Sequence, residues 1–461
     1  MTSTPAPASA QRPLRVAVIG AGPAGIYAAD ALAAQDDVPV AVDLVDRLPT
    51  PFGLVRHGIA PDHLKMRALR DTLHRTLDHE RVRFVGNVDV GVDISLDELR
   101  RHVDAVVYTY GAAGDRRLGI EGEDLPGSLP ATSVVSWYTG HPDTDRALVE
   151  DAVVRARDVV VIGLGNVALD VARVLARCPA ELEVTDMPQH VLDVLAAAPV
   201  DRVTVLGRRG PAQATFTTQE LRELGHLEQA TVVVDGTQLT MDPEPTDRAV
   251  LRNVTEMRSW VDHVPEPGQV ELRLRFFARP VRLLGTDRVT GIEVERTAVD
   301  AEGRATGTGD FDVVPADLVV RSVGYRGHPL PGLPIDERSG TVPHAAGRVL
   351  RDGEPAPGEY VAGWIKRGPT GVVGTNKHDA RETVATLLAD VAAGSLTPGG
   401  PVDDLVDTLA ARGVDAVLLS HWESIDAAEV ALGATRGRAR TTMHDRADLL
   451  AAAKVAAATT G

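Results

Sequence analysis

The chain has 461 residues, enough for two or three ordinary domains, and 44% of them are apolar, as in a typical globular protein. Its formal net charge of −17 argues against general nucleic-acid binding, because phosphate backbones require clustered cations. The single cysteine, Cys178, excludes an intrachain disulfide, a protein-ligated iron–sulfur cluster and a dithiol redox pair.

Residues 1–13 are rich in Ala, Ser, Thr and Pro and have neither a basic start nor an apolar core. This composition predicts a disordered tail and not a signal or transit peptide. No apolar run approaches the length of a membrane span, so we expect no integral membrane segment and a cytoplasmic location.

The first patterned stretch is an apolar, β-branched run over 16–19, which indicates a buried parallel strand. Gly20 allows a tight turn out of this strand, Gly22 lets the backbone approach a pyrophosphate, and Gly25 permits close helix packing. The helix expected over 24–35 points its positive N-terminal end at the phosphates. The stretch therefore predicts a dinucleotide-binding turn.

A second apolar strand, over 40–45, ends at Asp46, where a carboxylate is expected to meet the ribose hydroxyls. A loop dense in Pro and Gly follows over 48–63, and such a loop is costly unless a bound group orders it. The basic helix expected over 64–77 is either a solvated face or a docking surface.

The opening pattern occurs again after the apolar strand over 159–162, as Gly163-Leu-Gly165-Asn-Val-Ala168 and a helix to about 176. Two such units in one chain are far more specific than one, and they imply two nucleotides.

The next strand of the second unit, over 203–206, ends at Arg208 and Arg209, where an acidic residue would suit NAD. Guanidinium groups bind phosphate oxygens bidentately, so this pair favours the 2′-phosphate of NADP(H). An arginine pair elsewhere on the surface would carry no such meaning.

The remaining stretches complete the two units. Residues 111–130 form a crossing rich in Gly and Pro, and the strand over 318–323 leads back. Between them, strands over 271–277, 281–284 and 291–296 are expected to form a small antiparallel elaboration. After a strand over 360–364, a helix opening near Gly371 offers amide donors to an anion or carbonyl, and the last sixty or so residues are mostly amphipathic helix.

Two nucleotide units, one of them suited to NADP(H), imply two cofactors that exchange electrons, and FAD is the best interpretation for the first unit. Hydride transfer from nicotinamide to flavin needs stacking, orientation and exclusion of water, with no protein nucleophile. The cysteine count closes off a disulfide acceptor, and a one-electron carrier remains open.

Four motifs together resemble the adrenodoxin-reductase-type ferredoxin–NADP(+) reductases, and the likeness runs from about Leu14 to the carboxy terminus. They occupy residues 46–63, 163–170, 205–211 and 363–371, in this order. The resemblance implies an α/β fold with two Rossmann-like dinucleotide-binding domains, as in disulfide-reductase-like flavoproteins. The expected parts are a tail over 1–13, an FAD domain over 14–112 and 325–461, and an inserted NADP domain over 113–324.

Site residues follow from the same resemblance. It implies that the FAD pyrophosphate lies on Gly20, Gly22, Ala24 and Gly25, with the ribose at Asp46, the adenine side at Leu54, and the flavin at Trp364 and Gly371. It implies that NADP(H) contacts Gly165, Asn166, Val167, Arg208, Arg209 and Glu220. His63 and Glu223 are expected near the nicotinamide–flavin contact as tuning or proton-handling groups, and no metal site is expected.

The resemblance predicts an NADPH-dependent FAD oxidoreductase that delivers single electrons to a ferredoxin-like iron–sulfur protein, with a monomer as the expected state. A quinone or dye reductase and an electron-transfer subunit of a larger flavoenzyme are the alternatives in the same class. A flavin monooxygenase usually carries a further fingerprint, which this sequence lacks. A non-catalytic nucleotide sensor is the alternative in another class, and it would show no flavin reduction by NADPH.

Overall fold

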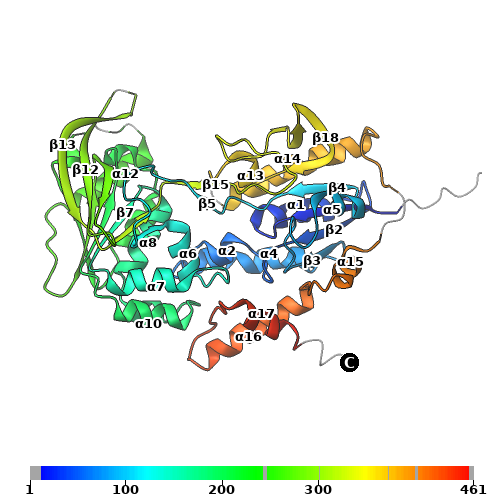
Figure 1. The fold of residues 1–461 in the computed structure, drawn as a ribbon, viewed down its shortest axis with the longest axis horizontal. Coiled ribbons are helices and arrows are strands. Elements are labelled where there is room, and N and C mark those ends of the chain that lie inside the picture. Colours follow the sequence, from blue (N-terminus) through cyan, green and yellow to red (C-terminus); the bar gives the residue numbers. More distant parts are fainter. Residues whose placement is uncertain are drawn as a thin grey trace, which may run out of the picture.

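The computed structural model describes residues 12–241, 245, 247–300, 302–371, 373–399 and 403–455, so residues 1–11 of the predicted tail lie outside it. The described chain forms two lobes side by side, with the C-terminal helices along one flank (Figure 1). We call the part built on a seven-stranded sheet the first lobe and the part built on a six-stranded sheet the second lobe.

The sheet of the first lobe takes strands from both ends of the described chain, in the order β16-β17-β18-β4-β1-β2-β3. Strands β18, β4, β1, β2 and β3 run parallel, and β17 and β16 add an antiparallel edge. The strands are β1 (Leu14–Ile19), β2 (Val40–Val45), β3 (Val82–Val85), β4 (Ala105–Tyr108), β16 (His344–Ala345), β17 (Arg348–Arg351) and β18 (Glu354–Val361).

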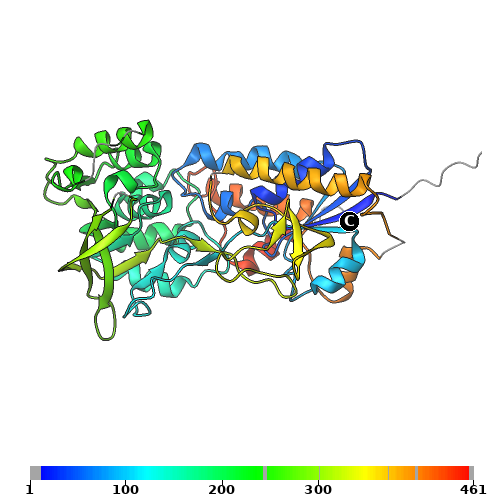
Figure 2. The same cartoon turned by 90° about the horizontal axis from the view of Figure 1, so that it is seen from above.

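Apart from Arg15, strand β1 is apolar because both faces of its sheet are covered. Val16 and Val18 pack in one cluster with helix residues such as Ile26, whereas Ala17 and Ile19 pack in another on the opposite face. Figure 2 shows the long helix α14 (orange) running along this lobe. Its helices are α1 (Pro23–Ala33), α2 (Leu54–His57), α3 (Leu64–Arg67), α4 (Leu69–Leu77), α5 (Leu96–His102), α13 (Trp364–Arg367) and α14 (Val373–Ala392).

The sheet of the second lobe is wholly parallel, in the order β6-β14-β7-β8-β10-β9, and it lies between β4 and β16 in the chain. Its strands are β6 (Ser128–Pro130), β7 (Asp158–Ile162), β8 (Arg202–Leu206), β9 (Ala230–Val234), β10 (Val270–Arg275) and β14 (Leu318–Arg321). Its helices are α6 (Ala131–Tyr138), α7 (Arg146–Arg155), α8 (Asn166–Ala176), α9 (Pro179–Leu182), α10 (Gln189–Ala197), α11 (Thr218–Leu224) and α12 (Arg248–Arg258), with 3-10 turns at Pro211–Gln213 and Gln238–Thr240. The second lobe is therefore an insertion into the first.

A two-stranded ribbon joins the lobes. Strand β5 (Gly114–Asp115) leaves the first lobe and pairs antiparallel with β15 (Tyr325–Arg326), which returns to it (Figure 1). The domain boundaries expected at 112/113 and 324/325 fall just before these strands and stay a prediction.

Two elements differ from the sequence-based expectation. The strand predicted over 271–277 was assigned to the antiparallel elaboration, but β10 lies in the parallel sheet between β8 and β9, because its alternate apolar side chains are buried there. The antiparallel sheet consists of β11 (Ala278–Leu284), β12 (Gly291–Val299) and β13 (Ala305–Pro315). The single helix predicted over 64–77 is two helices, because α3 ends and α4 begins at Ala68.

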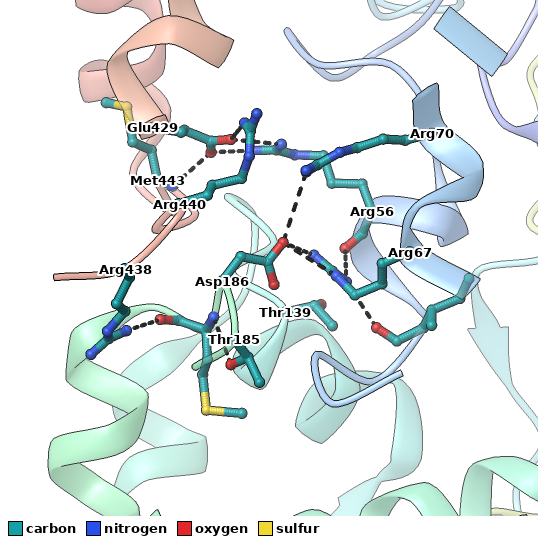
Figure 3. A network of polar contacts seen from close by, with 12 residues as sticks. Arg56, Arg67, Arg70, Thr139, Thr185, Asp186, Glu429, Arg438, Arg440 and Met443 are labelled. Atoms are coloured by element: carbon teal, nitrogen blue, oxygen red, sulfur yellow. Dashed lines mark hydrogen bonds and ion pairs between the residues drawn. The ribbon is translucent and has the colours of Figure 1, made fainter. Parts of the chain in front are cut away.

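The C-terminal helices α15 (Leu405–Ala411), α16 (Leu419–Ala434) and α17 (Arg446–Ala453) pack against the first lobe and reach the second. Glu429, fully buried on α16, accepts hydrogen bonds from Arg56 of α2 at 2.5 and 3.0 Å and from Arg440 at 3.0 Å. Arg67 of α3 binds Asp186 of the second lobe at 2.5 Å (Figure 3). Ion pairs thus join three parts of the chain at one junction.

Among the described helices, none combines the length and apolarity needed to span a bilayer.

Candidate functional site

Glycine stands at three positions of the first turn for different structural reasons. Gly20 adopts a φ of +105°, and a Cβ there would lie 2.7 Å from Cα of Tyr110. A Cβ on Gly25 would lie 1.9 Å from the carbonyl oxygen of Gly20, so both positions are required by the fold itself. Gly22 is different, because its φ is −78° and a Cβ would meet only Cα of Gly53, at 3.8 Å. The protein's own atoms leave room at Gly22, as expected for a turn that a ligand approaches.

Helix α1 begins at this turn without a side-chain cap. Gly22 is its N-cap and supplies no acceptor for the first-turn amides, which include those of Ala24 and Gly25. An uncapped helix N-terminus with unencumbered backbone suits an anion such as a pyrophosphate.

The carboxylate of Asp46 is bound to the backbone around the same turn. One oxygen accepts the N–H of Ala21 at 2.6 Å, and the other accepts the N–H of Leu48 at 2.9 Å. Burial raises the pKa of Asp46, and these two hydrogen bonds oppose the rise. A carboxylate has further lone pairs to offer a ribose, so the sequence-based role of Asp46 stays a prediction.

Two segments far away in the sequence reach the first turn. Gly53 touches Gly22, since a Cβ on Gly53 would lie 2.8 Å from Cα of Gly22, and Leu54, which follows it, is 43% exposed. Gly363, with a φ of +78°, approaches Ala24 so closely that a Cβ would lie 2.6 Å from that of Ala24. The loop after β2 and the turn after β18 therefore converge on the start of α1.

Trp364 follows this convergence and stacks on Tyr325, with ring centroids 5.7 Å apart. Its indole N–H is buried, and no hydrogen-bond partner exists for it among the described residues. A buried indole N–H normally has an acceptor, so the site fits a bound group that presents one, as a flavin ring does. Gly371, the other predicted flavin contact, has a φ of +81° and lies exposed just before α14.

The second turn uses the same devices. Gly163 has a φ of +135°, and a Cβ there would lie 2.1 Å from the carbonyl oxygen of Ser322. Gly165 leaves room, because the nearest atom to its Cβ would be Oγ1 of Thr215 at 3.6 Å. Asn166 begins α8 and accepts the N–H of Thr217 at 2.8 Å, while Val167 is partly buried against the core of the lobe.

Arg208 and Arg209 lie directly after β8 and line a cavity of about 300 Å³ together with Arg279, Gly303, Arg304 and Ala305. Neither Arg208 nor Arg209 forms an ion pair with any carboxylate among the described residues. This contrasts with Arg279, which is paired with Glu295. Two cations without counter-charges fit the phosphate that the sequence predicted there.

A buried charged cluster lies where the loop after α2 meets the second lobe. Nε2 of His63 lies 2.9 Å from Asp170 on α8 and 2.8 Å from Glu220 on α11. Arg173, fully buried on α8, lies 2.7 Å from the same nitrogen and binds Asp62 at 2.7 Å. The cluster ties the first-lobe loop to the helix that follows the second glycine turn.

The charge state of His63 follows from these neighbours. Burial disfavours the imidazolium, but hydrogen bonds to Asp170 and Glu220 outweigh it and raise the pKa of His63 to about 9. His63, Asp170 and Glu220 are spaced like the ligands of a metal ion. The guanidinium of Arg173, however, already lies among them, 2.7 Å from Nε2 of His63. At neutral pH the cluster therefore holds a proton on His63.

Glu223 does not share this cluster. Its nearest ion-pair partner is His226, at 4.0 Å, and its side chain is 37% exposed. The family resemblance placed Glu220 at NADP(H), and it placed His63 and Glu223 near the nicotinamide–flavin contact; these roles stay predictions. In the structure, Glu220 is the carboxylate of α11 that contacts His63. The two residues are three apart and so lie near one face of α11. Glu220 is buried at the junction, whereas the side chain of Glu223 is partly exposed.

Sequence reasoning gave no role to Asp62, Asp170 and Arg173. One signal could have found the last two, because they are charged residues at i, i+3 within the otherwise apolar helix over 166–176.

Comparisons with known proteins agree with this geometry. The family model for pyridine nucleotide-disulphide oxidoreductases matches residues 14–210. NADPH-ferredoxin reductase FprA of Mycobacterium tuberculosis is 43% identical over 457 residues, which cover 95% of this chain and 99% of that protein. Mitochondrial NADPH:adrenodoxin oxidoreductase of Arabidopsis thaliana is 39% identical over an alignment that covers 96% of this chain and 96% of that protein. The solved structure of M. tuberculosis FprA in complex with NADPH superposes with a TM-score of 0.90 at 42% identity, over 96% of this chain and all of that one.

Proposed function

This chain belongs to the adrenodoxin-reductase-type ferredoxin–NADP(+) reductases, and from that premise we propose that it oxidises NADPH through FAD and passes electrons to a ferredoxin-like iron–sulfur protein. One observation carries the proposal. The chain has two open glycine turns, of which one is followed by Asp46 and the other by Arg208 and Arg209, which pair with no carboxylate among the described residues.

FAD fits the first lobe. Gly22 leaves space at an uncapped helix start, and Trp364 offers a buried N–H that lacks an acceptor among the described residues. Gly20, Gly22, Ala24, Gly25, Asp46, Leu54, Trp364 and Gly371 are the residues that we propose hold it. The chemistry that bound FAD supplies is acceptance of a hydride and release of its two electrons one at a time.

The second lobe binds and orients the electron donor in this proposal. Gly165, Asn166 and Val167 hold the NADPH pyrophosphate, and Arg208 and Arg209 hold its 2′-phosphate through charge-assisted hydrogen bonds. The 2′-phosphate lies far from the nicotinamide ring that reacts. The energy of its binding to the two arginines therefore serves to position that ring.

His63 keeps a proton at the junction of the lobes, and Asp170 and Glu220 fix the position of that proton. Arg173 fixes the two carboxylates in turn. The cluster lies at the contact between the lobes, where the cations His63 and Arg173 are set among the carboxylates of Asp62, Asp170 and Glu220. Glu223 stays a candidate for the same reaction, on the family resemblance alone.

The electron acceptor that we propose is a separate ferredoxin-like iron–sulfur protein. The single Cys178 cannot hold a cluster in this chain, and the curated relatives are named for ferredoxin and adrenodoxin. A monomer and a cytoplasmic location complete the proposal, and they are checked by light scattering and by cell fractionation.

Stopped-flow reduction of the purified holoenzyme tests the proposal. We expect NADPH to bleach the flavin absorbance much faster than NADH, and a ferredoxin to accelerate reduction of cytochrome c. Equal rates with the two nucleotides would refute the role of Arg208 and Arg209. If the enzyme reduces quinones or dyes and ferredoxin never accelerates its turnover, the quinone-reductase alternative is supported. If NADPH does not bleach the flavin absorbance at all, the nucleotide-sensor alternative is supported.

A further inference from the structure

The three-stranded antiparallel sheet has no role in the function described so far, yet it forms one wall of the cavity at Arg208 and Arg209. Arg279, on β11, and Arg304, just before β13, line that cavity with the arginine pair. Four arginines around one cavity of about 300 Å³ therefore come from two different sheets.

The antiparallel sheet also fixes the backbone of the arginine pair. The hydroxyl of Thr297, fully buried on β12, donates to the carbonyl oxygen of Arg208 at 2.8 Å. The N–H of Phe277, at the start of the same sheet, donates to the carbonyl oxygen of Arg209 at 3.1 Å. The sheet thus holds the pair in place in addition to lining its cavity.

Arg279 is itself held in one orientation. Its guanidinium binds Glu295 on the neighbouring strand, and Glu295 also accepts the N–H of Gly309 at 3.1 Å. A guanidinium has five N–H donors, and one carboxylate uses at most two of them. Arg279 therefore keeps donors for a second anion while Glu295 holds its side chain still.

We propose that Arg279 is a third phosphate-binding residue, which selects NADP(H) over NAD(H) by contacting the 2′-phosphate together with Arg208 and Arg209. The inference rests on the proposed function and deepens it. Arg304 is paired with Asp300 at 3.2 Å and is largely exposed, so it adds only long-range attraction.

The charges support this assignment. Arg208 and Arg209 bring two positive charges without counter-ions among the described residues, and a phosphate monoester carries between about one and a half and two negative charges at pH 7. Arg279 is already neutralised by Glu295, so its contribution is directional hydrogen bonding and not net charge.

Calorimetric titration of the FAD-loaded holoenzyme with adenosine 2′,5′-bisphosphate and adenosine 5′-monophosphate isolates the 2′-phosphate. We expect Arg279→Ala to weaken binding of the bisphosphate about tenfold, the loss typical of one hydrogen bond to a charged group, and to leave the monophosphate unchanged. The matched control is Arg282→Ala, because Arg282 lies on the same strand and binds Glu293 of β12 at 3.0 Å, but does not line the cavity.

Two further variants separate direct contact from other effects. Arg279→Ala leaves Glu295 unpaired near the phosphate, so the double variant Arg279→Ala/Glu295→Gln removes that repulsion, and we expect most of the tenfold loss to persist. Arg279→Lys keeps the ion pair with Glu295 but lacks the planar fork, and we expect partial loss.

Each outcome is informative. An unchanged affinity for the bisphosphate in Arg279→Ala, full recovery in the double variant, or an equal loss in Arg282→Ala would overturn the inference. If the parent protein itself binds both nucleotides equally, the assignment of NADP(H) to this lobe fails, and that result is distinct from failure of Arg279 alone. Melting temperatures of all variants show whether a loss comes from unfolding.

Discussion

The two glycine turns are built alike but end differently. In each, the first glycine has positive φ and no space for a Cβ, and the middle glycine has an ordinary φ and open space. The third position is Gly25 in the first unit and the fully buried Ala168 in the second. The backbone device for a pyrophosphate is therefore repeated, while the end of the following strand differs.

At that strand end, the first unit places Asp46, which binds its own glycine turn at Ala21. The second unit places Arg208 and Arg209, which bind no carboxylate among the residues described. The carboxylate at one strand end thus binds its own backbone and keeps lone pairs for a ligand, whereas the other strand end keeps positive charge for a ligand. In the proposed function, the glycine turn binds a dinucleotide and the next strand end selects which one.

The largest effect is expected from replacing glycines of the first turn. Gly25→Ala puts a Cβ 1.9 Å from a backbone oxygen, so we expect the free energy of unfolding to fall by about 3 kcal/mol or more. Gly22→Ala meets nothing closer than 3.8 Å, so the chain should fold normally and yet lose FAD. Circular dichroism measures folding, and the ratio of flavin to protein absorbance measures FAD content. A Gly22→Ala protein with full flavin content would contradict the role given to this glycine.

The second expected effect concerns nucleotide choice. Replacing both Arg208 and Arg209 by alanine removes the charge-assisted contacts to the 2′-phosphate, and we expect KM for NADPH to rise about a hundredfold. KM for NADH should change little, because NADH has no phosphate at that position. Steady-state kinetics with both nucleotides measure the difference, and parallel changes would remove the distinction between the two strand ends.

The third expected effect separates Glu220 from Glu223. Glu220→Gln removes one of the two carboxylates that contact His63, so we expect a lower pKa for that imidazole. Glu223→Gln is the matched control on the same helix, because its carboxylate lies outside the cluster and should leave the pKa of His63 unchanged. Titration of the His63 ring signals by NMR measures both pKa values. A larger shift in Glu223→Gln than in Glu220→Gln would show that Glu223, and not Glu220, is the carboxylate of α11 that acts on His63.

The smallest expected effect is on the pH dependence of stability. The pKa of His63 is about 9 in the folded chain against 6.5 for an ordinary imidazole, so its stabilising contribution is complete below about pH 6.5. That contribution is lost as the pH rises through 9. We therefore expect His63→Gln to lower Tm most near pH 6 and progressively less toward pH 10. A Tm difference that stays constant over this range would show that His63 is not charged in the folded protein.

Much of the fold was predictable because local patterns dictate it. The apolar strands over 16–19 and 159–162, the glycines after them and the arginine pair at 208–209 are short-range signals, and the structure has β1, β7 and β8 where these patterns lie. The assignment of the strand over 271–277 was wrong, because the sheet to which a strand belongs depends on its neighbours. At the buried cluster, the sequence singled out His63 but not its contacts with Asp170 and Glu220. These partners lie on α8 and α11, more than a hundred residues away in the chain.

The sequence by itself determined that this protein has two dinucleotide turns, and that cations follow the second, because both are local demands of backbone conformation and charge. Only the tertiary structure decided which side chains meet between the lobes. It brought Glu220, and not Glu223, to His63, and it set Arg279 beside Arg208 and Arg209. The physical reason is that a pairing across lobes depends on how whole elements pack, which no stretch of a few residues encodes.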